Sequence, residues 1–392
     1  MRRPLTGLLV ADFSRVLAGP LATMYLADLG ATVVKVERPG RGDDTRAWGP
    51  PWTEKSSSYF EALNRSKLSV AWDLNDPADL AKARELARRA DVLVENFMTG
   101  TLARFGLGYA AVRTSNPGIV YASITGFGSG AGASLPGYDF VAQAFGGLMS
   151  ITGEQGGAPQ KVGVALVDVL TGKDATIGIL AALQQRAVSG AGEHIEVNLV
   201  SSLLGSLVNQ ASAFLTTGVA PAAMGNAHPS IAPYEPLQCA DLPLAVACGN
   251  DGQFVRLTGA LGIPALADDP RFATNADRVA NRESLVAALE AQLTTEPAAH
   301  WEQRLRAAGV AAAPVNDIGT AFAQARDLGL TPTFSVGDDH PEQVRNPILF
   351  SGNALDDATP PPGVGEHTLL VEDWLASSDP RPTLDQPTRS LA

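Results

Sequence analysis

The sequence predicts an α/β protein with a parallel, Rossmann-like sheet, because short apolar runs alternate with helical segments from the N-terminus onward. The runs at residues 8–13, 32–37, 91–97 and 118–124 have the length and composition of buried strands. Helical signals fill the intervals between them. An alternation at this pitch is typical of strand–helix–strand units and indicates that the strands run parallel.

The first helices carry clear start signals. Gly19 and Pro20 open a helical stretch that runs to residue 29, with the proline in the first turn, where its missing N–H costs nothing. Asp76 followed by Pro77 predicts a helix N-terminus, and Asp79 adds an acidic residue to the first turn. One face of this helix is expected to be apolar and is formed by Leu80, Ala83, Leu86 and Ala90.

The second half of the chain has a different organisation. A helix is expected at residues 175–188, a strand at 193–198 and a further helix at 200–215. Residues 218–236 are rich in Gly, Ala and Pro, which predicts a linker. A second unit follows, with a strand at 244–248 and helical stretches within 251–261, 275–293 and 298–308. Pro and Gly become frequent again from residue 332, and a loose tail is expected from residue 379.

Composition limits the classes of function. The chain has 392 residues, which favours two domains over one. Its formal net charge of −12 argues against nucleic acid or anionic lipid as a partner, although a local basic patch could still hold a small polyanion. Cys239 and Cys248 are too few for a disulfide framework and are expected in the core. Charged residues interrupt the N-terminal apolar run, so neither a signal peptide nor a membrane span is expected, and a cytoplasmic location follows.

Two segments could place reactive groups at a helix start. Asp168 follows the apolar run VGVALV and precedes a helix, where the helix dipole and free N–H groups stabilise a carboxylate. A simple helix cap and a functional carboxylate both fit this local sequence. The loop at residues 249–253 (GNDGQ) could present N–H groups to an oxyanion, or it could be an ordinary strand-to-helix turn.

Basic residues follow the predicted strands. Arg38, Arg41, Arg46 and Arg104 lie in loops of the kind that bind ligands in open α/β sheets, and Arg suits phosphate groups. Each of them could equally be solvated surface charge. No GxGxxG motif with a following acidic residue comes after the first strand, none of the histidines has metal spacing, and no GxSxG elbow occurs. No metal is therefore expected, and the fold alone does not imply NAD.

A series of motifs extends along nearly the whole chain, from residue 4 to about residue 370. They read PLTGLLVADFSRVLAGPLAT, ADLGATVVKVERPGRGDDTR, NRSKLSVAWDL, ADVLVENFMTG, GYDFVAQAFGGLMSITGE, VALVDVLTG and GNDGQF. In this order they resemble the class III CoA-transferase family, which includes formyl-CoA transferase, carnitine CoA-transferase and methylacyl-CoA racemases. The resemblance implies an enzyme that acts on acyl-CoA and small carboxylic acids, with coenzyme A as the acyl carrier and no metal.

The resemblance also implies roles for individual residues. Asp168 corresponds to the family's nucleophile. The family's glycine loop, which closes over the active site, corresponds to Gly249, Asn250, Asp251, Gly252 and Gln253. Positions that contact CoA correspond to Val16, Leu17, Ala18, Arg38, Asn96, Phe97, Arg104 and Tyr138. Formyl-CoA transferase has Gln in place of Leu17 and glycines in place of the Asn-Asp pair, which argues against formate and oxalate as substrates of this chain.

The family fold implies a division of the chain. The large α/β domain is expected at residues 1–217, followed by a linker at 218–236 and a smaller inserted α+β domain at 237–331. A second linker is expected at 332–348, and residues 349–392 are expected to return to the large domain. Two such chains are expected to thread through each other as an interlocked homodimer.

The implied reaction moves CoA from an acyl-CoA to a carboxylic acid through a mixed anhydride and a thioester, both formed on Asp168. The backbone of the loop at 249–252 is the candidate oxyanion site. An α-methylacyl-CoA racemase is one alternative, but racemases of the family have His where this chain has Tyr138, and glycines after the later Asp. A CoA-binding protein without catalysis is the other alternative, and the intact Asp168 and glycine loop argue against it.

Overall fold

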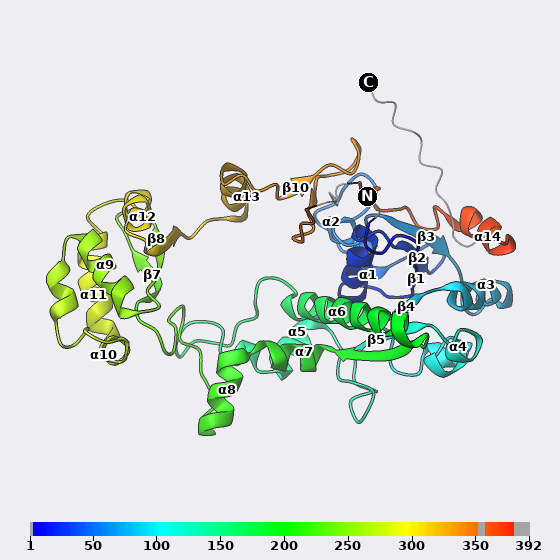
Figure 1. The fold of residues 1–392 in the computed structure, drawn as a ribbon, viewed down its shortest axis with the longest axis horizontal. Helices are drawn as coiled ribbons and strands as arrows, with labels where there is room; N and C mark the ends of the chain where they lie inside the picture. Colours follow the sequence, from blue (N-terminus) through cyan, green and yellow to red (C-terminus); the bar gives the residue numbers. More distant parts are fainter. Residues whose placement is uncertain (1–2, 352–356, 380–392) are drawn as a thin grey trace. The chain divides into compact units, whose positions relative to one another are not determined.

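The structure is a computed structural model that describes residues 3–351 and 357–379 (Figure 1). The chain divides into two compact units, which are described separately. Unit 1 comprises Met1–Leu148, Val162–Thr217 and Thr331–Ala392, and unit 2 comprises Met149–Lys161 and Gly218–Leu330. All but the first residue of the tail expected from residue 379 lies outside the described residues.

Unit 1 is built on a parallel sheet of six strands, as the alternating pattern predicted. In space the strands follow the order β3-β2-β1-β4-β5-β6, and every pair is parallel. The order changes direction between β1 and β4, which both flank the centre of the sheet. The strands are β1 (Leu9–Asp12), β2 (Thr32–Glu37), β3 (Lys67–Ala71), β4 (Val92–Glu95), β5 (Val120–Thr125) and β6 (Glu193–Asn198).

Helices cover both faces of this sheet (Figure 1). On one face, α1 (Ala18–Asp28) and α6 (Leu166–Ser189) pack on a cluster that contains Val10 of β1. On the other face, α3 (Pro77–Arg89), α4 (Tyr109–Ser115) and α14 (Thr368–Ala376) pack on a cluster that contains Leu9 and Ala11. Adjacent β1 residues thus face opposite layers, as a strand buried on both sides requires.

Local signals explain where several helices begin and how closely they pack. The Asp76 side chain accepts hydrogen bonds from the N–H groups of Ala78 and Asp79, so the predicted start of α3 is confirmed. Gly172 allows α6 to lie against α1, because a Cβ at this position would approach the Ala18 carbonyl oxygen to 2.7 Å. α14, near the C-terminal end of the described chain, packs on α3 and β3, and its Glu372 accepts a hydrogen bond from the Trp72 indole at 3.1 Å.

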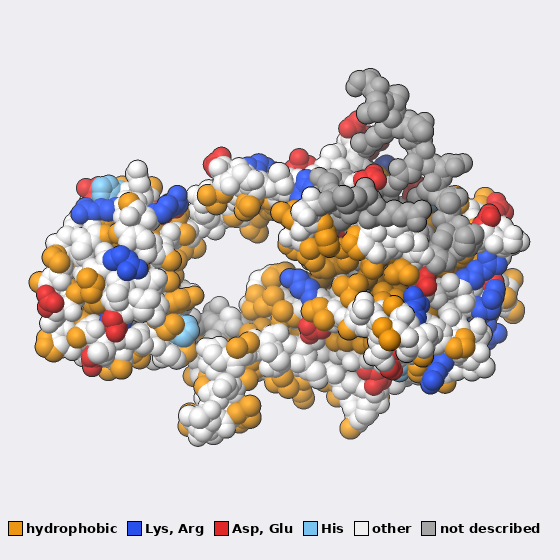
Figure 2. Space-filling view, viewed as in Figure 1, with side chains coloured by type: hydrophobic (Ala, Val, Ile, Leu, Met, Phe, Trp, Pro, Cys, Tyr) orange, Lys and Arg blue, Asp and Glu red, His pale blue; other side chains and the backbone are white. Residues whose placement is uncertain are grey.

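The predicted single helix at 200–215 is wrong. The structure has two helices there, α7 (Leu199–Ser206) and α8 (Val208–Thr217), which meet at an angle of 80° where Val208 has a φ of +37°. Among the described residues, no single helix has the length and hydropathy of a membrane span, and only this bent pair meets those criteria jointly. Apolar side chains reach the surface along α8 (Figure 2), where Leu215 is 81% exposed.

The remaining short elements of unit 1 lie in its loops and in its returning C-terminal part. They are η1 (Asp44–Ala47), α2 (Ser58–Glu61), η2 (Leu102–Phe105), α5 (Asp139–Phe145), β10 (Thr333–Phe334) and β11 (Gln343–Val344). A further short turn, η3 (Leu148–Ser150), spans the boundary to unit 2.

Unit 2 has its own sheet and its own core. The strands β7 (Tyr234–Gln238), β8 (Pro243–Ala247) and β9 (Ala311–Pro314) form an antiparallel sheet in the order β7-β8-β9. Buried Leu257, Leu289 and Trp301 belong to the core that its helices share with the sheet. The helices are α9 (Asp251–Leu261), η4 (Pro264–Asp268), α10 (Asn275–Ala280), α11 (Arg282–Leu293), α12 (Ala298–Ala307) and α13 (Ile318–Asp327).

Four charged side chains are fully buried inside unit 1. Lys35 Nζ donates a hydrogen bond to the Asp43 carboxylate at 2.9 Å, and Lys67 Nζ donates to Asp12 at 3.2 Å, with all four side chains at 0% exposure. Burial alone would raise the pKa of Asp43, but the Lys35 ammonium lowers it to about 2. Burial lowers the pKa of Lys67 to about 8 even beside Asp12. The four charges therefore depend on one another, since each would be costly to bury alone.

This buried network holds the loop that follows β1. Lys35 Nζ donates to the Ser14 carbonyl at 2.8 Å, and Asp12 accepts from the Ser14 N–H at 2.9 Å. Asp43 accepts from the N–H of Val16 at 3.3 Å. Val16 has a φ of +69°, a left-handed conformation that a β-branched residue rarely adopts. The hydrogen bonds from buried charges impose this conformation on the loop.

Replacing Lys67 by Met tests the network. The substitution keeps the side-chain length but removes the ammonium that pairs with buried Asp12, so we expect the free energy of unfolding to fall by about 3 to 5 kcal/mol. Chemical denaturation measures this loss. Arg88, whose ion pair with Glu85 on α3 is exposed, provides the matched control, and Arg88→Met should cost less than about 1 kcal/mol. An equally small loss for Lys67→Met would contradict the interpretation.

Candidate active site

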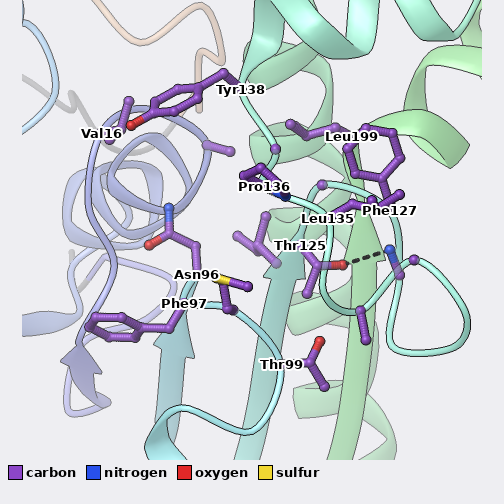
Figure 3. Close-up of a pocket in the computed structure, with 18 of the residues that line it drawn as sticks. Val16, Asn96, Phe97, Thr99, Thr125, Phe127, Leu135, Pro136, Tyr138 and Leu199 are labelled. Carbon is purple, nitrogen blue, oxygen red and sulfur yellow. Dashed lines mark hydrogen bonds between the residues drawn. The ribbon is translucent and has the colours of Figure 1, made fainter.

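A cavity of about 240 Å³ lies at the carboxyl ends of β1, β4 and β5 (Figure 3). This is where the strand order changes direction, and ligands of open parallel sheets bind at such a switch point. The loop after β1, the loop after β4, the segment after β5 and the first turn of α6 form its wall. Residues from these four parts include Val16, Asn96, Phe97, Thr125, Tyr138 and Asp168.

The cavity brings together most of the positions for which the family resemblance implied contact with CoA. Val16, Ala18, Asn96, Phe97 and Tyr138 line it together with Asp168. In Figure 3 the Tyr138 ring extends toward Val16, and the Asn96 side chain lies between the loops after β1 and β4. Leu17 is outside the lining, because its side chain is buried in a cluster with Leu21, Met24 and Leu63.

Asn96 has a structural task at this site. Its side-chain oxygen accepts a hydrogen bond from the Arg15 N–H at 2.8 Å, and its amide nitrogen donates to the Arg15 carbonyl at 2.6 Å. Asn96, which follows β4, therefore fixes the loop after β1 through the backbone of Arg15. The buried charge network fixes the same loop through separate hydrogen bonds. The Asn96 bonds act on Arg15, next to the strained Val16, and the network bonds act on Ser14 and on Val16 itself.

Tyr138 is presented by a close crossing of two loops. A Cβ on Gly137 would approach the Gly126 Cα to 2.5 Å, so only glycines allow the segment after β5 to cross the segment before α5. Tyr138 is the N-cap residue of α5, and the residue is 58% exposed. The ring thus stands at the open side of the cavity.

Asp168 lies inside the first turn of α6 and does not cap it. The N-cap residue is Ala165, which has no side chain able to accept a hydrogen bond, so the simple-cap alternative for Asp168 is wrong. Among the described residues, none donates a hydrogen bond to the Asp168 carboxylate. Burial, followed by the nearby Asp139 carboxylate, raises the pKa of Asp168 to about 7. A carboxyl group in this state is more basic, and as an anion more reactive, than an ordinary aspartate.

Arg38 and Arg104 do not line the Asp168 cavity. Arg38 lines a second cavity of about 190 Å³, whose wall also contains Phe97 and Trp72, and it donates to the Asp44 carboxylate at 2.5 Å. Arg104 is exposed on η2, and neither of these cavities includes it in its lining.

The other two basic candidates differ from each other. The Arg46 guanidinium makes two hydrogen bonds to the Glu37 carboxylate, at 2.7 and 2.8 Å, and lies over the Phe60 ring. It is therefore part of the fold. Arg41 is exposed at the rim of another open pocket, which Trp48 and Lys55 also line.

The predicted glycine loop belongs to unit 2 and begins α9. The Asn250 side chain caps this helix by accepting from the Gln253 N–H at 2.9 Å, and the Gly249 N–H donates to the Gln253 side chain at 2.7 Å. Asp251 pairs with buried Arg278 at 2.7 Å. In this conformation the Gly249 N–H has a partner inside the loop, so it would act as an oxyanion donor only after Gln253 releases it.

Three residues near Asp168 escaped the sequence analysis. Arg15 follows β1, and its guanidinium carbon lies 5.1 Å from the centroid of the Phe97 ring. The guanidinium pairs with Asp44 at 3.0 Å, and its buried Nε has no partner among the described residues. Burial and the carboxylates of Asp168 and Asp139 raise the pKa of Tyr59 to about 12, so its phenol stays protonated. The signal that selected Arg38, a basic residue after a strand, would also have found Arg15. Asp139 and Tyr59 gave no comparable signal.

Within the described ranges, residues 3–351 and 357–379, no group of three or more His, Cys, Asp or Glu side chains is arranged to hold a metal ion. Cys239 and Cys248 are both buried free thiols in unit 2. The functional groups that line the Asp168 cavity include two carboxylates, Asp168 and Asp44, together with an arginine, an amide and aromatic rings.

Comparisons with known proteins agree with this arrangement. The chain matches CoA-transferase family III over residues 5–368. A succinate–glutarate CoA-transferase of Agrobacterium fabrum is 44% identical over 94% of each chain. A succinyl-CoA:glutarate CoA-transferase of Mus musculus is 41% identical over 94% of this chain and 86% of its own. An acetyl-CoA:oxalate CoA-transferase of Acetobacter aceti is 43% identical over 81% of this chain and 82% of its own.

A solved structure extends the likeness to the fold. The crystal structure of a CAIB/BAIF family protein from Brucella suis superimposes with a TM-score of 0.86 at 42% sequence identity, covering 96% of this chain and all of that one. Family match, sequence identity and fold therefore agree over nearly the whole length. The chain belongs to CoA-transferase family III, and it is an enzyme that transfers coenzyme A between an acyl-CoA and a carboxylic acid.

Proposed function

We propose that Asp168 is the nucleophile of this CoA-transferase and carries CoA between the two acids. The carboxylate attacks the thioester carbonyl of the donor, forms a mixed anhydride and releases CoA thiolate. The thiolate then attacks the Asp168 carbonyl, which releases the donor acid and leaves an aspartyl-CoA thioester. The acceptor carboxylate attacks this thioester to form a second anhydride. The returning thiolate attacks the acceptor carbonyl, which yields the new acyl-CoA and restores Asp168.

The observation that carries this proposal is the state of the Asp168 carboxyl group. It lines the cavity at the switch point of the sheet, receives no hydrogen bond from the described residues, and has a pKa raised to about 7. A structural aspartate at a helix start is normally stabilised as an anion by N–H donors and has a lowered pKa. The reversed situation at Asp168 is characteristic of a reactive carboxylate.

The chemistry also explains why a carboxylate suits the reaction better than water activated by a base. Exchange of CoA between two acids conserves the thioester, so any attack by water would waste the activated acyl group. Every step above forms one acyl bond and breaks another, without net uptake or release of a proton. The partly enclosed site in which Asp168 lies limits the access of water.

We infer that the substrates are short dicarboxylic acids and their CoA thioesters. The relatives named above are described as acting on succinate, glutarate and oxalate. Oxalate returns as a candidate here, although the replacement of glycines by Asn250 and Asp251 argued against it.

The adenine nucleotide of CoA would bind at the second cavity, where Arg38 and Arg15 could pair with phosphate and Phe97 could stack.

We further propose that two chains associate as an interlocked homodimer in which unit 2 is an inserted domain. Apolar side chains of unit 1 remain exposed, among them Phe145 at 67%, Val208 at 70% and Leu215 at 81%. An uncovered apolar surface of this kind favours association.

The glycine loop at Gly249–Gly252 keeps its proposed role as an oxyanion site that forms when Gln253 releases the Gly249 N–H.

A matrix of donors and acceptors tests the proposed function. Wild-type protein incubated with succinyl-CoA, acetyl-CoA or glutaryl-CoA and a panel of acids should form the new acyl-CoA, with dicarboxylic acids as the best acceptors. Asp168→Asn removes the nucleophile, and the transfer rate should fall by several orders of magnitude. Racemisation of a 2-methylacyl-CoA, or CoA binding without transfer, would instead support one of the two alternative functions.

Stability provides the control for Asp168→Asn. Because the pKa of Asp168 is raised, the folded protein loses stability as pH rises from about 4 to about 7 and the group ionises. At pH 8 the Asn variant should therefore be more stable than wild type by roughly 2 to 4 kcal/mol, since one pKa unit corresponds to about 1.4 kcal/mol. Asp174→Asn, on the exposed face of α6, should change neither stability nor activity. A stable Asp168→Asn variant with normal transfer rates would refute the mechanism.

The pH dependence of wild-type turnover gives an independent prediction. Only the ionised form of Asp168 attacks the thioester, so kcat/KM for the acyl-CoA should rise with pH and level off above a midpoint of about 7. The profile is measured from pH 5 to pH 9 and corrected for the titration of the acyl-CoA phosphate, which is measured on the substrate alone. A kcat/KM that stays constant down to pH 5 would contradict the raised pKa.

A further inference from the structure

The first turn of α6 is capped from another helix. Its N-cap residue, Ala165, offers no side-chain acceptor for the free N–H groups at the helix start. Asp139, the first residue of α5, takes this role across a gap of 28 residues: its Oδ1 accepts from the Val167 N–H at 2.7 Å and from the Asp168 N–H at 3.2 Å. Asp139 thus contacts the backbone of the proposed nucleophile directly.

The Asp139 carboxylate is itself held in place. Its second oxygen accepts a hydrogen bond from Gln143 Nε2 at 2.6 Å, and Gln143 Oε1 accepts from the Val162 N–H at 2.9 Å. Asp139 is 9% exposed and Gln143 is fully buried. This chain of hydrogen bonds connects α5 to the segment that leads into α6, so it fixes where the first turn of α6 begins.

The arrangement also has an electrostatic effect on Asp168. N–H groups at a helix start normally stabilise an anion, but here two of them donate to Asp139. The Asp139 charge opposes ionisation of Asp168, in addition to the larger effect of burial. Among titratable and charged groups, Arg15, Asp44 and Tyr138 line the cavity with Asp168, and Tyr59 and Asp139 interact with Asp168 from outside the lining. Lys173 and Asp174 on α6 itself are exposed.

We propose that Asp139 is a positioning residue that orients Asp168 and destabilises its free carboxylate relative to its covalent states. This inference rests on the proposed function of Asp168. In the anhydride and in the CoA thioester, residue 168 is uncharged, so forming either one removes the repulsion from Asp139. The negative charge leaves with the CoA thiolate and then with the released acid. Asp139 therefore shifts the internal equilibrium toward enzyme that carries CoA.

Asp139→Asn is the first variant that tests this role. An Asn oxygen can still accept from the N–H groups of Val167 and Asp168, but the charge is lost. The Asn nitrogen would face the Gln143 nitrogen, so Gln143 must turn its amide and give up the bond from Val162. This single variant consequently changes both the charge and one hydrogen bond.

A double variant separates the two effects. In Asp139→Asn with Gln143→Glu, the Asn nitrogen donates to the new carboxylate, whose other oxygen accepts from the Val162 N–H. The net charge is that of wild type, and residue 139 still accepts the hydrogen bonds from the N–H groups of α6. Only the long contact of 3.4 Å from Gln143 to the Val164 carbonyl is lost. The negative charge has moved away from the start of α6 to the side chain of residue 143.

The measured quantities are the ratio of CoA-bound to free enzyme and the pH profile of kcat/KM. Each protein is incubated at pH 8 with a fixed ratio of succinyl-CoA to succinate, quenched with acid and analysed by intact mass spectrometry. We expect the ratio to fall about tenfold in both variants, which corresponds to one pKa unit at Asp168. The midpoint of the pH profile should move to lower pH in both, and Asp174→Asn should behave as wild type.

The outcomes separate this inference from the function on which it rests. Wild-type enzyme that turns over without ever carrying CoA would refute the proposed mechanism as a whole. If wild type carries CoA and the double variant matches it in ratio and in pH profile, Asp139 acts only through its hydrogen bonds and the inference is wrong. If the single variant does not fold, the double variant alone decides between these outcomes.

Discussion

The hydrogen bonds between the buried ions Lys67 and Asp12, and between Lys35 and Asp43, are the constraint on which the site depends. Fully buried charges are tolerated only when they are paired and hydrogen-bonded, so these four side chains have little freedom to move. The same groups bond to the backbone of the loop after β1. Through that loop the network holds Val16 in its left-handed conformation and shapes one wall of the cavity. The stability of the sheet and the geometry of the site are therefore coupled.

Another part of the cavity lining, the first turn of α6, carries a carboxylate that no described residue neutralises by a hydrogen bond, that of Asp168. Asp168 is partly buried, its carboxylate receives no hydrogen bond from the described residues, and its N–H donates to a second carboxylate, that of Asp139. A fold that pairs its buried charges so completely beside the loop after β1 leaves this one unpaired at the switch point of the sheet. The contrast within one unit supports a chemical role for Asp168, because strain and unpaired charge persist where function requires them.

In unit 1, the sequence predicted elements that depend on local signals better than elements that depend on contacts between distant residues. The strand at 32–37 and the start of α3 at Asp76 follow from apolar runs and capping residues, which are local signals. β3 was not predicted as a strand because Lys67 and Ser69 interrupt it, and both are buried by partners far away in sequence, Asp12 and Glu37. The break between α7 and α8 occurs at Val208, a β-branched residue with a positive φ that local sequence signals do not predict.

The same limit applied to the site. Asp168 and the loops after β1 and β4 could be selected from motifs, whereas pairings that only the fold creates could not. Arg46, a candidate for phosphate binding, is paired with Glu37. Asp139, which accepts a hydrogen bond from the Asp168 N–H, lies on a different helix and has no sequence pattern that points to this contact. Residue types and order therefore predicted the chemistry, and tertiary contacts determined which groups are available for it.

The fate of the carboxylate oxygens tests the central claim most directly. If the acceptor acid attacks an Asp168 thioester, one of its oxygens remains on Asp168 when the new acyl-CoA leaves. After turnover with an acceptor whose carboxylate carries a heavy oxygen isotope, peptide mass spectrometry should find the label on Asp168 and on no other residue. Efficient transfer with an unlabelled Asp168 would contradict the account, because CoA would then have moved without a covalent bond to that residue.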